Sequence, residues 1–149
     1  MILILRFVRT FIDSNFHDKI ISNLLLLLQE VEKKLVQIFD AQLIPYFSRW
    51  EATVPVPSQA FKAIVTSIKR LHDAVSDMLP QAHLERLFKS LLILFKRRLK
   101  QQIAKLSIPT DSGPQHGVVV SEIAFFRSEL HSLKKLSSLS DILDDVWEK

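Results

Sequence analysis

The sequence predicts an all-α fold, an antiparallel bundle of about four long helices followed by a short C-terminal helix. Only two glycines occur, Gly113 and Gly117, so the tight turns on which sheets and barrels depend are scarce. Apolar residues recur at steps of three and four positions over long stretches, which is the spacing of one helical face. Prolines fall near the ends of these stretches, where helices stop.

The first helix is predicted over residues 14–47. Asp13 or Ser14 can cap its start, and Pro45 marks its last turn or a kink. Residues 1–13 are assigned to an N-terminal extension that either continues this helix or ends an earlier one, and residues 14–149 to a single helical-bundle domain. The apolar stripe of the first helix contains Ile20, Leu24, Leu27, Leu28, Val31, Leu35, Ile38 and Phe39.

A proline-rich connector over residues 50–58 separates the first helix from the second. Pro55 and Pro57 force extended backbone before them, and Ser58 can cap the helix that follows. The apolar face of this second helix continues to Leu79, and Pro80 stops it. The sequence therefore predicts a rigid link between two helices.

The later helices follow the same spacing. A third, central helix is predicted over 82–107, because its apolar surface is wider than one stripe. Residues 110–117 use both glycines in a turn, and a fourth helix is predicted over 118–136. A short final helix over 137–149 is expected to close the bundle like a lid, through Leu139, Leu143, Val146 and Trp147.

No motif of a known catalytic or metal-binding class occurs in the sequence. Without cysteine, thiolate nucleophiles and cysteine zinc sites are excluded. The five histidines lack the i, i+4 spacing of a helical metal site, and the acidic patch of Asp144, Asp145 and Glu148 has adjacent carboxylates that diverge on a helix. We therefore expect no enzyme, no cofactor, no metal site and no small-molecule substrate.

No segment is typical of a signal peptide or of a transmembrane helix. Four apolar residues follow Met1 before Arg6 interrupts them, and the leucine run 24–28 is much shorter than the roughly 20 apolar residues of a membrane span. The absence of cysteine fits a reducing compartment. We expect a cytoplasmic chain that is not integral to a membrane.

The third predicted helix carries seven basic residues and one acidic residue, Glu85. Lys96, Arg97, Arg98 and Lys100 are its candidate partner or lipid surface. Such a face can meet anionic lipid or an acidic partner helix, or it can be a solvated face whose aliphatic stems cover the edge of the core. We expect no nucleic acid partner, because the aromatic residues fall on the apolar stripes and do not interleave with the basic ones.

Three segments resemble one protein family. They are Val54–Phe61 with its Pro-Val-Pro-Ser connector, Leu94–Leu106, and Gly113–Val119 with its Gly-Pro-Gln-His-Gly turn, followed by Ala124, Phe125 and Val146–Glu148. Their order and spacing are similar to the C-terminal domain of the vacuolar protein sorting-associated protein 54 family. The resemblance covers roughly residues 16–148 and is specific, because connector and turn join helices in the same sequence order.

The resemblance implies a helical bundle of the tethering-complex (CATCHR-like) type, with no catalytic residue and no cofactor. The family supplies a subunit of the GARP complex, which tethers endosome-derived carriers at the trans-Golgi network. It therefore implies retrograde transport from endosomes, with other tethering subunits or SNAREs and the carrier membrane as partners. It also implies peripheral localisation at the trans-Golgi network and endosomes. Direct binding of anionic lipid by the basic face of the third helix is the alternative function.

In the family, this domain ends a much longer protein whose N-terminal coiled-coil region assembles with the other subunits. That region is absent from this sequence of 149 residues. Complex assembly is therefore not carried over from the resemblance, and the resemblance by itself assigns no binding residue.

Overall fold

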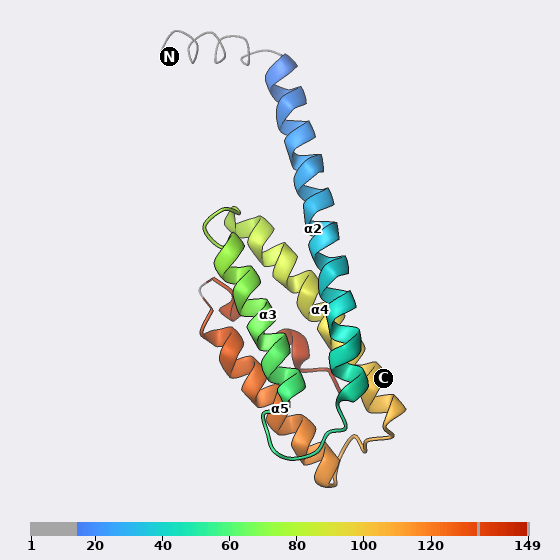
Figure 1. Ribbon diagram of the computed structural model, residues 1–149. Coiled ribbons are helices and arrows are strands. Elements are labelled where there is room, and N and C mark those ends of the chain that lie inside the picture. The colour runs from blue at the N-terminus through green and yellow to red at the C-terminus, as the bar shows by residue number, and fades with distance from the viewer. Residues whose placement is uncertain (1–14, 134, 149) are drawn as a thin grey trace. The chain divides into compact units, whose positions relative to one another are not determined.

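The computed structural model of the chain describes residues 15–133 and 135–148 (Figure 1). These residues form four α-helices and one 3-10 helix without a strand, which confirms the predicted all-α fold. The predicted extension over residues 1–13 and the predicted cap at Asp13 or Ser14 lie outside the described residues. Two compact units are present, and the division between them falls after Gln37. The single domain over 14–149 stays a prediction.

The described part of the first unit belongs to helix α2 (Asn15–Arg49). Successive helical residues point about 100° apart, so the run Leu24–Leu28 makes this stretch apolar on all sides. Its large exposed apolar side chains are Ile21, Leu24, Leu25, Leu26, Leu27 and Val31. No helix within the described residues combines the length and the apolar character that crossing a bilayer requires.

The second unit begins within α2 and contains α3 (Gln59–Val75), α4 (Gln81–Lys105) and α5 (Pro114–His131). Its consecutive helices run in opposite directions (Figure 1), and α3 packs against α5. The rings of Phe95 and Phe126 stack with centroids 4.2 Å apart. Each of the four helices contributes one buried phenylalanine to this aromatic core: Phe47, Phe61, Phe95 and Phe126.

Local chemistry explains where the first two helices end. Pro45 lies inside α2, and one further turn follows it before the helix ends at Arg49, so it stands near the helix end as predicted but not in the last turn. Ser58 caps α3 as predicted, and its Oγ accepts a hydrogen bond from the Phe61 N–H at 3.3 Å. The predicted end of α3 at Leu79 is wrong. The helix ends at Val75, and the N–H groups of Met78 and Leu79 both donate to the Val75 carbonyl oxygen at 3.0 Å in the turn that follows.

The predicted bounds of the fourth helix, 118–136, are also wrong. Helix α5 begins at Pro114, since proline in a first turn lacks only an N–H that the helix start does not use. Gly113 alone serves the turn, with φ +99°, whereas Gly117 lies inside the helix. The helix ends at His131, where the Ser132 hydroxyl donates to the Glu129 carbonyl, a local bond that competes with helical hydrogen bonding.

The C-terminal segment contains a short helix as predicted, but the helix covers less than the predicted range 137–149. It forms a 3-10 helix, η1 (Ser137–Leu143), followed by turns, because its serines favour local turn hydrogen bonds over a regular helix. The segment η1 contacts both α4 and α5. Of the predicted lid residues, Leu139, Leu143 and Val146 are buried, and Trp147 is partly exposed with its ring 4.3 Å from that of His116.

Replacement of Leu143 by glutamine should lower the thermal stability of the domain. Leu143 is 1% exposed, and burial of a leucine contributes roughly 1.5–3 kcal/mol. An unpaired buried amide costs about 1–3 kcal/mol more, in a domain stable by only about 5–15 kcal/mol. We expect Leu143→Gln to lower the melting temperature by several degrees, as measured by circular dichroism.

The matched control is Val120→Gln, at a position that is 46% exposed, which should leave the melting temperature nearly unchanged. A Leu143→Gln protein that melts within about 1 °C of wild type would show that η1 is not part of the folded core.

Candidate functional site

Three of the four candidate cations of α4, Lys96, Arg97 and Arg98, point in different directions, because successive helical residues are about 100° apart, whereas Lys100 lies one turn after Lys96 on the same face. Arg98 reaches Asp40 of α2 through two hydrogen bonds, Nε to Oδ1 at 2.7 Å and an NH2 nitrogen to Oδ2 at 2.8 Å. Hydrogen bonding from Arg98 lowers the pKa of the Asp40 carboxyl and outweighs the opposing effect of burial. The pair therefore fastens the last turns of α2 to α4.

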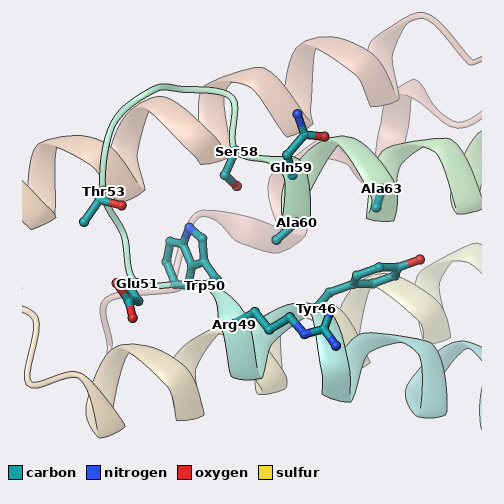
Figure 2. Close-up of a pocket in the computed structure, with 9 residues that line it drawn as sticks. All are labelled: Tyr46, Arg49, Trp50, Glu51, Thr53, Ser58, Gln59, Ala60 and Ala63. Atoms are coloured by element: carbon teal, nitrogen blue, oxygen red, sulfur yellow. The ribbon is translucent and has the colours of Figure 1, made fainter.

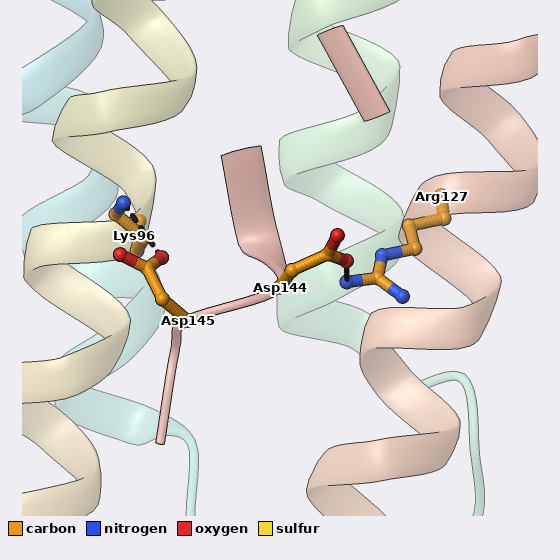
Figure 3. Close-up of polar contacts among 4 residues, drawn as sticks. All are labelled: Lys96, Arg127, Asp144 and Asp145. Atoms are coloured by element: carbon orange, nitrogen blue, oxygen red, sulfur yellow. Dashed lines mark hydrogen bonds and ion pairs between the residues drawn. The ribbon is translucent and has the colours of Figure 1, made fainter. Parts of the chain in front are cut away.

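Two adjacent aspartates that follow η1 bind opposite helices (Figure 3). The Lys96 ammonium donates to Asp145 Oδ1 at 2.8 Å, and this hydrogen bond lowers the pKa of Asp145. The guanidinium of Arg127 on α5 pairs with Asp144. The two carboxylates thus diverge and tie the C-terminal segment to α4 on one side and to α5 on the other.

These ion pairs divide the predicted basic surface. Lys96 and Arg98 are held by carboxylates, whereas Arg97 is exposed and Lys100 is partly exposed. Within residues 15–133 and 135–148, Arg97 and Lys100 form no direct ion pair. Two of the four candidate residues therefore serve the fold, and two remain available to a partner.

A groove of about 390 Å³ lies where α2 ends and α3 begins (Figure 2). Its volume is near the lower end of the range for ligand pockets, about 300–1,000 Å³. We call it the α2–α3 groove. Six of the residues that line it are Tyr46, Arg49, Trp50, Ser58, Ala60 and Ala63.

Glu122 of α5 holds Trp50 and Ser58, two of the residues that line this groove. Its carboxylate is fully buried and accepts hydrogen bonds from Trp50 Nε1 at 2.8 Å, from the Ser58 N–H at 2.6 Å and from the Ser58 hydroxyl at 2.6 Å. Gln102 of α4 adds a bond from its amide to the Trp50 carbonyl oxygen at 3.2 Å. Both ends of the 50–58 connector are therefore held to other helices.

Sequence reasoning found the cations of α4 but missed both Glu122 and the groove. One feature of the sequence did point to Glu122. Glu122 lies three residues after Val119 and four before Phe126, so a carboxylate occupies the apolar stripe of α5. A charged residue at such a position needs buried donors, and the connector supplies them. In the part of the chain that the structure describes, no cluster of histidines and carboxylates could hold a metal ion.

The fold places this chain in the class of all-helical domains built from antiparallel helices, and comparison with known proteins supports that class. No protein-family model matches the chain. It is 31% identical to a solved Vps54 C-terminal domain, with a TM-score of 0.81 over 97% of this chain and 98% of that one. A solved C-terminal domain of the Vps54 subunit of the GARP complex matches with a TM-score of 0.77 and 33% identity, over 90% and 96% of the two chains.

Longer relatives carry the same name. Vacuolar protein sorting-associated protein 54 of Drosophila melanogaster is 35% identical over 123 residues, 80% of this chain, and the Homo sapiens protein is 33% identical over 138 residues, 93% of it. The chain spans 13% of the length of each of these relatives. The chain belongs to the Vps54 family and corresponds to its C-terminal domain.

The hydrogen-bonded ion pair of Asp40 and Arg98 should make the free energy of unfolding depend on pH in the acid range. Because the pKa of Asp40 is lowered from its ordinary value of 3.8, the ionised carboxyl is stabilised by folding. The contribution is complete above that ordinary value and is lost as the pH falls through the lower, folded pKa. Both side chains are about 30% exposed, so we expect a contribution of about 1 kcal/mol or less.

The measurement is urea unfolding of wild type and Asp40→Asn from about pH 7 to about pH 2. The difference in free energy of unfolding between wild type and Asp40→Asn should be constant near neutral pH and should vanish at the acid end of the range. A difference that grows with acidity would contradict the assignment. Asp18→Asn in the first unit is the control, since Asp18 is exposed and has no direct ion pair within the described residues.

Removal of the Glu122 carboxylate should destabilise the domain more than removal of an exposed one. In Glu122→Ala, the donors of Trp50 and Ser58 lose their acceptor, and each unsatisfied buried group costs about 1–3 kcal/mol. We expect Glu122→Ala to lose at least about 3 kcal/mol in urea unfolding. Glu122→Gln should lose less, because its amide oxygen still accepts.

The exposed residue Glu51 is the matched control, and Glu51→Ala should stay within about 0.5 kcal/mol of wild type. Equal losses in Glu122→Ala and Glu51→Ala would refute a structural role for the buried carboxylate.

Proposed function

We propose that this chain acts as the C-terminal domain of a GARP-type tethering subunit. Its role is in retrograde transport from endosomes to the trans-Golgi network. One observation carries the proposal: the chain matches a solved C-terminal domain of the Vps54 subunit of the GARP complex along 96% of that domain. The domain acts by association with proteins and with the carrier membrane, and not by catalysis. Its surface grooves and partly unpaired cations suit association.

The proposed partners are other tethering-complex subunits or SNAREs, together with the endosomal carrier membrane. The proposed location is cytoplasmic, peripheral at the trans-Golgi network and endosomes. Two features of the described residues support a peripheral mode of attachment. None of the described helices qualifies as a membrane span, and Arg97 is exposed on α4.

Direct binding of anionic lipid is the second candidate function. The exposed side chain of Ile93 lies one turn before Arg97 on α4, so an apolar and a cationic group share one face. Each basic residue near an anionic surface contributes about 1 kcal/mol. Because Lys96 and Arg98 already pair with aspartates, Arg97 and Lys100 carry this candidate.

Expression of the domain with a fluorescent tag, scored against endosomal and Golgi markers, tests the proposal. We expect colocalisation with those membranes, and diffuse cytosol under all conditions would count against autonomous targeting. A variant with Arg97→Gln and Lys100→Gln separates the two candidate functions. Association through proteins predicts that it localises like wild type, whereas association through anionic lipid predicts that it becomes diffuse.

A further inference from the structure

The α2–α3 groove is built from two pairs of residues that face each other. Tyr46 and Arg49 lie three residues apart on α2, and Ala60 and Ala63 lie three residues apart on α3, so each pair shares one face of its helix. Figure 2 shows the alanine methyl groups pointing toward the α2 side of the groove. Because alanine is small, the two helices leave room between them for a side chain from another molecule.

The α2 wall offers two polar donors that the fold does not use. Among the described residues, neither the Arg49 guanidinium nor the Tyr46 hydroxyl has a hydrogen-bond or ion-pair partner. Arg49 is exposed and Tyr46 is partly exposed. A guanidinium presents parallel N–H groups that match the two oxygens of a carboxylate.

The groove also has a fixed apolar end. Trp50 is 3% exposed, and its indole Nε1 donates to Glu122, so packing and this hydrogen bond hold the ring in place. Ser58, at the opposite side of the connector, is held by the same carboxylate. A groove with walls that are already ordered binds without the cost of ordering them first.

The charge of the groove changes sign along its length. Glu51 lines the connector end, and Figure 2 places it on the far side of Trp50 from Tyr46, whereas Arg49 lies at the alanine-floored end. A uniformly anionic surface such as a membrane would meet the Glu51 carboxylate as well as Arg49. A peptide with one carboxylate beside one apolar side chain meets Arg49 alone.

We propose that the α2–α3 groove binds a short acidic peptide segment of a partner protein. A bulky apolar side chain of that segment enters against Ala60, Ala63 and Trp50, and a neighbouring aspartate or glutamate pairs with Arg49 and Tyr46. The inference goes beyond the proposed function. Binding in solution succeeds or fails irrespective of where the chain localises in cells, so the two failures are distinguishable.

Fluorescence polarisation with the intact 149-residue chain tests the inference. The probes are four fluorescein-labelled peptides, Ser-Glu-Glu-X-Ser-Gly, in which X is leucine, phenylalanine, tyrosine or tryptophan. We expect saturable binding of at least one peptide. Arg49→Gln should weaken it about tenfold or more, which corresponds to the loss of a hydrogen bond to a charged group. Tyr46→Phe should weaken it less, and Ala63→Leu should abolish it by filling the groove.

Two controls test whether binding depends on Arg49 and on the carboxylates of the peptide. Arg97→Gln removes an exposed arginine from α4 and should not change the affinity. The same peptide with glutamine in place of both glutamates should bind wild type as weakly as the acidic peptide binds Arg49→Gln. The melting temperature of each variant verifies that it is folded, and Ala60→Leu replaces Ala63→Leu if the latter does not fold.

Four results would overturn the inference, three of them in peptide binding. The three are the absence of binding by all four peptides at about 1 mM, undiminished binding by the folded groove-filling variant, and equal affinity of wild type and Arg49→Gln. Arg49→Gln that loses recovery on anionic vesicles but keeps its peptide affinity would assign the groove to lipid and also overturn it.

Discussion

The buried carboxylate of Glu122 is the constraint on which the second unit depends. A carboxylate withdrawn from water is costly unless donors replace its hydration. Here the donors are the Trp50 indole, the Ser58 amide and the Ser58 hydroxyl. Since Trp50 follows the end of α2 and Ser58 caps α3, one residue of α5 holds the end of one helix and the start of the next. The first turn of α3 also favours a negative charge at its N-terminus.

The ion pairs that hold the C-terminal segment are weaker than this contact, because they are more exposed. The carboxylates of Asp144 and Asp145, which hold the C-terminal segment to α5 and α4, are 61% and 47% exposed. Exposed pairs contribute little, so burial of Leu139, Leu143 and Val146 provides most of the attachment of that segment. Polar contacts therefore set the geometry at the connector, whereas apolar packing dominates at the C-terminus.

The helices could be predicted from the sequence because periodicity and proline act locally. The α4 bounds, Gln81–Lys105, lie within two residues of the predicted ones, since a wide apolar surface follows Pro80. The ends of α3 and α5 could not be placed in this way. They depend on local turn hydrogen bonds after Val75, on the bond of the Ser132 hydroxyl and on the conformation of Gly113, which compete with a continuing apolar pattern. The serine-rich C-terminal segment has helical spacing but too little helix propensity to be an α-helix.

The candidate surfaces show why binding sites are harder to find in a sequence than helices are. Lys96, Arg97 and Arg98 are consecutive and look like one basic site, but a helix directs them to different neighbours, and aspartates from α2 and from the C-terminal segment occupy two of them. The α2–α3 groove has the opposite character. Its arginine and its alanines are separated along the chain by the connector. The bonds of Glu122 to both ends of that connector and the ring contact of Phe47 with Phe61 bring them face to face. A run of consecutive charged residues therefore does not by itself indicate a binding surface. Here the candidate binding surface forms where contacts between distant residues hold two helices side by side.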